Sequence, residues 1–193
     1  IYCSVTGFGQ TGPDAARAGY DLMAQGIGGF MDLTGAVGGE PTRAGIPVSD
    51  IFTGVYSVIG VLAALQQRER TGKGCYVDTS LVDSTVGVLA NQALNFLVSG
   101  DVPQRMGNTH PNIVPYEVFA CADGHIILAA GNDSQYRKFC DAAGRTDLYT
   151  DARFATNESR VRHREVLVPL LAEVIRLRKR DDWVSSLETA GVP

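Results

Sequence analysis

One predicted helix limits the possible folds of this 193-residue chain more than any other segment. It begins at Ser49, a favourable N-cap, and Asp50 stands in its first turn, where the helix dipole favours negative charge. Apolar side chains then occupy almost every face over residues 51–65, and a glycine-containing stretch at residues 71–74 ends the helix. A helix that is apolar all round is normally buried in a sizeable core. We therefore expect residues 51–65 to be buried, in part by polypeptide beyond these 193 residues.

The same apolar run raises the question of a membrane span. It is shorter than the roughly 20 residues that a spanning helix needs. Gly54, Ser57 and Gly60 also interrupt it. We therefore predict no membrane-spanning segment and no membrane partner.

Composition narrows the class of protein. Hydrophobic residues make up 45% of the chain and charged residues 20%, which are values of an ordinary globular protein and exclude a disordered or collagen-like one. The length allows one domain or parts of two. The net charge of −4 provides no basic surface for a phosphate backbone, so we do not expect nucleic acid as a partner.

The four cysteines, Cys3, Cys75, Cys121 and Cys140, are widely spaced. The chain has no CxxC pair and no Cys/His cluster, so we predict no metal site. Reduced, buried thiols in a cytoplasmic protein are the favoured interpretation. A catalytic cysteine stays open as an alternative.

The order of predicted elements indicates an α/β or α+β protein with a domain boundary in the proline-rich loop at residues 101–115. Residues 1–100 form the first predicted domain, and residues 116–193 form a second, incomplete one. The chain starts inside a predicted strand and stops within a turn signal, so we expect an internal piece of a longer protein. The expected elements are strands at 1–5, 75–80, 116–121 and 125–130, the last two forming a hairpin at Asp123-Gly124, and helices at 20–33, 81–98, 133–143, 159–178 with a kink at Pro169, and 181–189.

A glycine loop at residues 7–12 (GFGQTG) matches the dinucleotide-binding pattern G-x-G-x-x-G after a strand. Pro13 and the polar residues 14–17 provide no apolar helix that could pack back on the strand. We therefore do not predict NAD binding. A tight turn at the end of a strand, near a phosphate or thioester ligand, is the better interpretation.

Asp50 is the strongest catalytic candidate. The free N–H groups and the dipole of a helix N-terminus hold a carboxylate in its ionised form, and an ionised carboxylate can act as nucleophile or general base. On these residues alone, an ordinary acid at a solvated helix start accounts for the same pattern. Asp21 has the same ambiguity at the start of the preceding helix.

Two further groups of residues have weaker signals. Gly107, Asn108 and His110 lie in the long loop, where binding residues concentrate, although a surface histidine is the favoured interpretation of His110. The arginines from Arg160 to Arg180 form a helical face whose charge nearby acids offset. That pattern predicts a solvated face.

Several motifs together resemble the class III CoA-transferases, a family that includes formyl-CoA transferase, carnitine CoA-transferase and α-methylacyl-CoA racemase. The resemblance runs along essentially the whole chain. It rests on GFGQTGP at 7–13, GYD at 19–21 with Gln25, Asp50 opening an apolar helix, RERTGKG at 68–74, NIVPY at 112–116, and GN at 131–132 with Gln135.

The resemblance implies a fold and a chemistry. The fold is a Rossmann-like, CoA-binding α/β domain followed by a smaller α+β domain, in an interlocked homodimer. Asp50 matches the catalytic aspartate, which forms an aspartyl anhydride with the acyl group of an acyl-CoA and then an aspartyl-CoA thioester. Coenzyme A is the shared substrate, and no metal takes part. Gly19, Tyr20 and Asp21 match residues at the CoA site, and Gly107 and Asn108 fall in a mobile lid.

One departure separates the possible reactions. The racemase branch has a histidine immediately before the aspartate at position 21, and this chain has Tyr20, whose ordinary pKa of ~10 suits it poorly as a proton shuttle. The resemblance therefore favours a transferase, closest to the branch that uses succinyl-CoA and small dicarboxylic acids. Arg43 is then a candidate to bind the far carboxylate of the acceptor, with an ordinary surface arginine as the open alternative. A racemase or epimerase, and a non-catalytic dimer subunit, stay open as alternatives.

Overall fold

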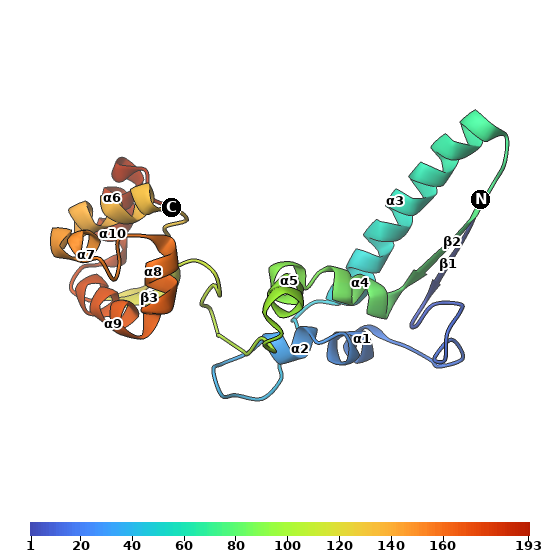
Figure 1. The fold of residues 1–193 in the computed structure, drawn as a ribbon, viewed down its shortest axis with the longest axis horizontal. Coiled ribbons are helices and arrows are strands. Elements are labelled where there is room, and N and C mark those ends of the chain that lie inside the picture. Colours follow the sequence, from blue (N-terminus) through green and yellow to red (C-terminus); the bar gives the residue numbers. More distant parts are fainter. The chain divides into compact units, whose positions relative to one another are not determined.

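The computed structural model describes residues 1–193 and divides them into two compact units, Ile1–Gly107 and Asn108–Pro193. We refer to them as the first unit and the second unit. The division falls within the loop at residues 101–115. Both units mix helices and strands (Figure 1).

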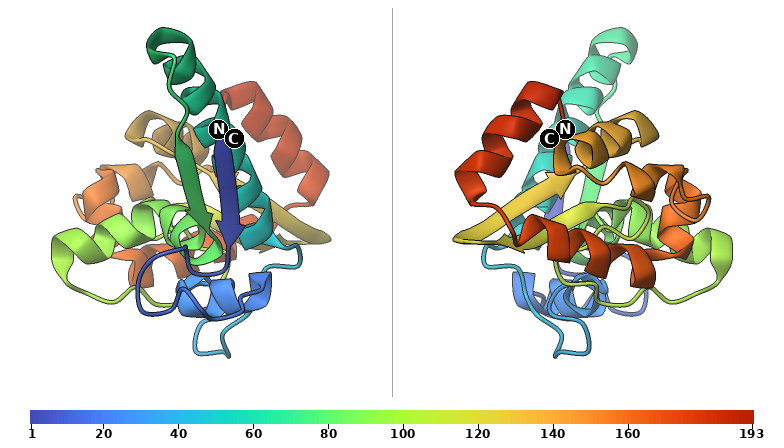
Figure 2. Two further views of the ribbon diagram at one scale, coloured as in Figure 1. Left: turned by 90° about the vertical axis from the view of Figure 1, so that its right-hand side faces the viewer. Right: turned by 90° about the vertical axis from the view of Figure 1, so that its left-hand side faces the viewer.

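The first unit is built around two parallel strands and one long helix. Strand β1 (Tyr2–Thr6) pairs with β2 (Tyr76–Ser80) in parallel. Between them in the sequence, α3 (Val48–Thr71) runs back along the pair and packs against both strands (Figures 1 and 2). The remaining helices of this unit are α1 (Asp21–Ile27), α2 (Phe30–Leu33), α4 (Leu81–Gly87) and α5 (Ala90–Ser99).

Two helices that the sequence predicts as continuous are broken in the first unit. The helix expected at residues 20–33 divides into α1 and α2, with Gly29 between them at φ +84°, a left-handed value that favours glycine. The helix expected at residues 81–98 divides into α4 and α5, which meet at an angle of 75°. Ala90 takes φ +48° where α5 begins. The apolar pattern continues across both breaks, so side-chain spacing did not reveal them.

Helix α3 packs on the first unit through small and polar residues. The hydroxyl groups of Thr53 and Ser57 donate to carbonyl oxygens one turn earlier, and Ser57 Oγ also lies 2.8 Å from Thr79 Oγ1 on β2. At Gly60 the strand comes so close that an added Cβ would lie 2.9 Å from Val77. The buried residues of α3 are Val48, Ser49, Thr53, Ser57 and Ala64.

The large apolar side chains of α3 are exposed within this chain. They include Ile51, Phe52, Val55, Tyr56, Val58, Ile59 and Leu62. Contacts inside these 193 residues therefore do not supply the burial expected for residues 51–65, part of which was expected from further polypeptide. The reason is that only the small face lets β2 and α4 approach the helix closely.

The length of α3 also contradicts the prediction that no segment is long enough to span a membrane. Helix α3 has 24 residues, because it extends beyond the apolar run at both ends, and its mean hydropathy reaches 1.8 over an 18-residue window. It is long and apolar enough to cross a membrane by length and composition. Core helices of globular proteins pass the same test, so this is weak evidence for a span.

The second unit is a hairpin covered by helices. Strands β3 (Tyr116–Cys121) and β4 (Gly124–Ala129) pair in antiparallel fashion, which confirms the hairpin predicted at Asp123-Gly124. Helix α9 packs on β3, and α10 packs on β4 and α6. The helices are α6 (Asp133–Ala143), α7 (Thr146–Thr150), α8 (Asn157–Arg162), α9 (Arg164–Ile175) and α10 (Arg180–Ala190). The largest side chains of its closed core are Phe119, Tyr136, Phe139, Phe154, Leu167 and Trp183.

Two expectations for the second unit were wrong. The helix predicted at residues 159–178 breaks at His163, and Pro169 lies inside α9. Arg160, expected on a solvated face, is completely buried. Its guanidinium donates to Val114 O at 2.6 Å, to Phe154 O at 3.1 Å and to Asp133 Oδ1 at 2.8 Å. Three acceptors from separate segments replace the water that this cation loses.

Candidate functional site

Asp50 lies in the first turn of α3, at the end of the first unit where the carboxyl ends of β1 and β2 also lie (Figure 1). Ligands of parallel α/β sheets bind at this end. Asp50 is exposed, and no hydrogen bond or ion pair engages its carboxylate. The carboxylate is therefore free to meet a ligand from solvent.

The N-terminus of α3 is capped by a distant residue. We expected Ser49 to cap it, but the helix begins at Val48, and the carboxylate of Asp21 takes the capping role. Asp21 Oδ1 accepts from the backbone N–H of Ser49 at 2.8 Å and from that of Asp50 at 3.4 Å. The expectation that free N–H groups at this terminus hold Asp50 was therefore wrong. Local spacing could not show this cap, because Asp21 is 28 residues away.

The side chain of Ser49 has a different role. It is fully buried, and its Oγ lies within hydrogen-bond distance, 2.7 Å, of Thr85 Oγ1 of α4. Thr85 is itself fully buried and also donates to Leu81 O. These contacts anchor the first turn of α3 to α4.

Gln25 joins two parts of this region. It is fully buried, and its Nε2 donates to Asp21 Oδ2 at 2.6 Å. Its Oε1 accepts from the backbone N–H of Ala44 at 2.8 Å. Sequence reasoning quoted Gln25 only as part of a family motif. The spacing of four residues between Asp21 and Gln25 in one helix was a signal for their contact, but nothing local pointed to Ala44.

The other predicted residues of this region differ in accessibility. Gly19 packs against Gly7 so closely that a Cβ on Gly19 would lie 2.6 Å from Gly7 Cα, which requires glycine at the contact. Tyr20 is 76% exposed. Residues 7–19 form turns and bends, and no helix follows the glycine loop directly, unlike in a dinucleotide-binding motif.

Arg43 is exposed in the loop between α2 and α3, and no hydrogen bond or ion pair engages its side chain. Gly107 is at φ +60°, and its N–H donates to Gly35 O at 3.1 Å, so it is tied to the start of the loop that carries Arg43. Asn108 opens the second unit and is exposed.

The second unit places titratable groups beside the start of β3. Thr109 Oγ1 donates to Glu117 Oε2 at 3.4 Å, and Glu117 Oε1 is buried with no partner. Burial raises the pKa of the Glu117 carboxyl. Burial and the charge of Arg164 lower the pKa of His110, whose Nδ1 accepts from Asn112 N at 3.0 Å. That bond orders the loop and uses the Nδ1 of His110.

The cysteines are all free, but only two of the four are buried as expected. Cys121 and Cys140 are buried, whereas Cys3 and Cys75 are partly exposed at the strand pair. Burial raises the pKa of the Cys140 thiol to about 11, which disfavours the nucleophilic thiolate. No group of three or more His, Cys, Asp or Glu side chains in the chain could hold a metal ion.

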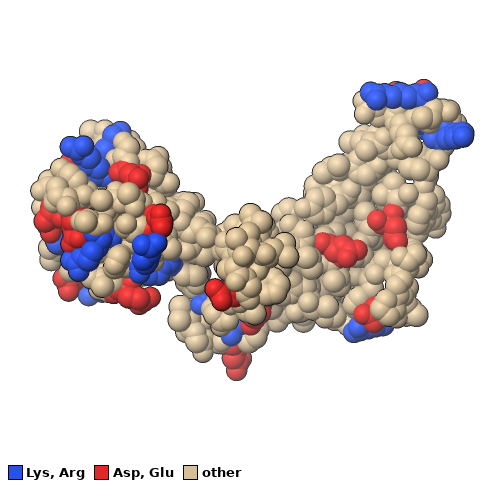
Figure 3. Space-filling view, in the orientation of Figure 1, with Lys and Arg blue, Asp and Glu red and all other residues tan.

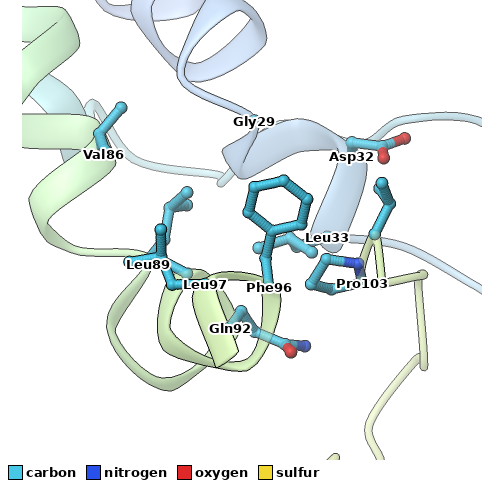
Figure 4. A pocket seen from close by; sticks show the side chains of 11 residues that line it. Gly29, Asp32, Leu33, Val86, Leu89, Gln92, Phe96, Leu97 and Pro103 are labelled. Carbon is cyan, nitrogen blue, oxygen red and sulfur yellow. The ribbon is translucent and has the colours of Figure 1, made fainter. Parts of the chain in front are cut away.

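An apolar cavity of about 380 Å³ lies beside α2, α4 and α5 (Figure 4). Leu33, Leu89 and Phe96 line it. Asp32 stands at the cavity and accepts from Arg105 at 2.6 Å. Asp50 is not among the lining residues, so the cavity is separate from the candidate site.

Comparison with known proteins identifies relatives. The sequence matches CoA-transferase family III across residues 1–193. It is 50% identical to succinate–glutarate CoA-transferase of Agrobacterium fabrum, covering 100% of this chain and 48% of that protein. It is 38% identical to human succinyl-CoA:glutarate CoA-transferase, covering 100% of this chain and 44% of that protein. A CAIB/BAIF family protein from Brucella suis has a similar crystal structure, with a TM-score of 0.78, 54% identity, and coverage of 100% and 51%. The chain thus spans about half the length of these relatives.

Proposed function

Because the chain belongs to CoA-transferase family III, we propose that the complete protein transfers coenzyme A from succinyl-CoA to a small dicarboxylic acid. The names of the relatives support this substrate class, since they pair succinate or succinyl-CoA with glutarate. The observation that carries the proposal is the position of Asp50 in the first turn of α3. Its exposed, unpartnered carboxylate stands at the helix start that matches the family's catalytic aspartate.

The first half of the proposed reaction loads CoA onto the protein. A carboxylate oxygen of Asp50 attacks the thioester carbonyl carbon, the C–S bond breaks, and CoA leaves as a thiolate. The product is a mixed anhydride of Asp50 and the donor acid. The thiolate then attacks the Asp50 carbonyl carbon, the anhydride C–O bond breaks, and the donor leaves as a carboxylate. Covalent catalysis of this kind divides one difficult step into easier ones.

The second half repeats these steps in reverse order with the acceptor. A carboxylate oxygen of the acceptor attacks the aspartyl-CoA thioester, and the CoA thiolate leaves again. The thiolate attacks the acceptor carbonyl of the new anhydride, which forms the product thioester and restores the Asp50 carboxylate. The cycle consumes no proton, electron or further reactant.

The contacts around Asp50 limit how these steps are stabilised. Backbone N–H groups commonly hold the oxyanion of such intermediates. The N–H groups of Ser49 and Asp50 already donate to Asp21, so the oxyanion donors must come from other groups. Within the Gly19–Asp21 segment, Tyr20 is the side chain most open to CoA, because Asp21 is engaged as the cap.

The surroundings of the site complete the proposal. The free guanidinium of Arg43 binds the far carboxylate of the acceptor, and Gly107 and Asn108 belong to a lid.

The first unit is part of a Rossmann-like CoA-binding domain, which its parallel strand pair supports. The exposed apolar face of α3 supports an interlocked homodimer. The free cysteines support a cytoplasmic location.

Mass spectrometry of the complete protein tests the nucleophile. The protein is incubated with succinyl-CoA, and hydroxylamine is added to trap the activated aspartate as a hydroxamate. We expect the modification on Asp50 in the wild type, none in Asp50→Asn, and an unchanged yield in Glu69→Gln at the exposed far end of the same helix. A modification on another residue, or full turnover by Asp50→Asn, would contradict the assignment.

The racemase alternative predicts a different signal. A racemase exchanges the proton next to the thioester carbonyl with solvent, whereas transfer through an anhydride leaves that proton in place. We expect no deuterium in product recovered from deuterated water after a few turnovers. Rapid incorporation would favour the racemase.

A further inference from the structure

Gln25 is buried in α1, and the two polar atoms of its amide bond to two different segments, α1 itself and the loop between α2 and α3. Its Nε2 donates to Asp21 Oδ2 at 2.6 Å, and its Oε1 accepts from Ala44 N at 2.8 Å. The first partner caps the helix that carries Asp50, and the second is the neighbour of Arg43 in the sequence. One side chain therefore links the proposed nucleophile to the loop that carries the proposed acceptor-binding arginine.

The chemistry of the link requires an amide. The carboxylate of Asp21 needs a donor, and the N–H of Ala44 needs an acceptor, and Gln offers both on one planar group. An ionised carboxyl at this position could accept but could not donate, and it would repel Asp21. An apolar side chain would leave Asp21 Oδ2 and Ala44 N without these partners.

The elements that Gln25 joins are also held by close contacts with α4. Helix α1 packs so closely on α4 that a Cβ on Gly28 would lie 2.7 Å from Thr85 Cγ2. Thr85 also holds the side chain of Ser49, the residue before Asp50. The first turn of α3 is thus fixed from α1 and from α4, while residue 44 is held through Gln25.

We propose that Gln25 is a positioning residue of the transfer reaction. By joining Asp21 to Ala44, it keeps the first turn of α3 and the Arg43 loop in register, so that an acid bound by Arg43 meets Asp50 in the reactive orientation. The inference rests on the proposed function. Gln25 acts through its two partners and contacts neither substrate.

The test uses the complete protein and three variants. Gln25→Glu keeps the shape but replaces the donor with a carboxyl. Gln25→Met keeps the length and removes both polar ends. Gln66→Glu adds the same charge on the exposed, polar end of α3 and is the matched control. For each variant, kcat and KM for succinyl-CoA and glutarate are measured from pH 5 to pH 8, with thermal melting as the check of folding.

We expect kcat at pH 8 to fall roughly 10- to 100-fold in Gln25→Glu and Gln25→Met, because misplacing reacting groups by about an ångström costs on that order. In Gln25→Glu the loss should shrink as pH falls, because the protonated carboxyl donates to Asp21 again. Gln25→Met should show no such recovery. The elements packed on α1 carry Asp32 on α2, Asp83 on α4, and Asp50 and Tyr56 on the first half of α3, and α1 itself carries Asp21. The loop that Gln25 bonds at Ala44 carries Glu40 and Arg43.

The outcomes separate the two proposals. If the wild type carries the trapped adduct on Asp50 and both Gln25 variants transfer CoA to glutarate with the wild-type kcat at pH 8, the role of Gln25 is wrong and the proposed function stands. A loss in Gln25→Glu that does not change with pH also overturns it. If the wild type forms no adduct on Asp50, the proposed function itself fails. Should Gln25→Met not fold, the pH profile of Gln25→Glu decides alone.

Discussion

The two units of this chain bury different kinds of side chain. The second unit closes an apolar core around Phe139, Leu167 and Trp183, each fully buried. The first unit buries mainly small and polar side chains, such as Thr53 and Thr85, and exposes the large apolar residues of α3. Charged groups are also sparse along α3 until its C-terminal end (Figure 3).

The two patterns of burial indicate which unit depends on contacts with further polypeptide. Large exposed apolar patches mark surfaces that bind other polypeptide. The second unit forms its apolar core from its own residues. The first unit leaves the large apolar side chains of α3 exposed for further contacts. The proposed catalytic residue, Asp50, lies in the first unit.

The largest effect is expected at Asp50. If the chemistry lies in the first unit, Asp50→Ala should lower kcat of the complete protein by at least ~10⁴-fold, because the nucleophile is lost. The exposed Asp182→Ala of the second unit should change kcat little. Steady-state kinetics with succinyl-CoA measure both. Near-wild-type turnover by Asp50→Ala would place the chemistry elsewhere.

The closed core of the second unit is tested at Arg160. Arg160→Met should lower the free energy of unfolding by about 3 kcal/mol, because it leaves the carbonyls of Val114 and Phe154 without their donor. Trp183 is the only tryptophan, so its fluorescence during urea unfolding reports this unit. Arg162→Met removes an exposed pair with Glu158 and should cost about 0.5 kcal/mol or less. Equal losses in the two variants would contradict the buried role of Arg160.

The open face of α3 is tested by self-association. We expect the 193-residue chain to associate through its exposed apolar side chains, and sedimentation velocity measures this. Leu62→Glu should weaken association roughly 10- to 100-fold, since charge at an apolar contact costs a few kcal/mol. Val166→Glu on the second unit is the control, because Val166 is also exposed. A monodisperse wild-type monomer would contradict the claim that the apolar face of α3 drives association.

Arg43 tests specificity within the first unit. A charge-assisted contact with the far carboxylate contributes ~1.5–3 kcal/mol. Arg43→Ala should therefore lower kcat/KM for glutarate by roughly one to two orders of magnitude, and much less for a monocarboxylic acid of similar length. Equal losses on both acceptors would indicate that Arg43 supports the loop or CoA instead.

The smallest effect is expected at Glu117. Burial raises the pKa of this carboxyl, so the folded protein holds its proton more tightly than the unfolded chain. The stabilisation is complete below the ordinary pKa and is lost as pH rises through the raised value. Glu117→Gln should therefore gain about 1 kcal/mol of stability at pH 8 and little at pH 4. Trp183 fluorescence at the two pH values measures this, with exposed Glu165→Gln as control. No difference between pH 4 and pH 8 would contradict it.

The family, and the features that depend on neighbouring residues, could be predicted from the amino-acid sequence. The Asp-Gly pair fixed the hairpin of β3 and β4, and the predicted helix at residues 133–143 matches α6. Asp50 could be placed in the first turn of a helix from the apolar pattern that follows it, although Ser49 is not the cap that the sequence suggested. The motifs around it identified the family that the whole chain matches.

The long-range partners of these elements could not be predicted and are seen in the folded structure. Asp21 caps α3 from 28 residues away, and Gln25 reaches Ala44 across 19 residues, so neither bond leaves a trace in local spacing. Arg160 is buried because acceptors from three segments converge on it. The face of α3 that faces β2 was likewise set by close approach and not by hydropathy. Periodicity records which side chains share a face, whereas packing chooses which face is covered.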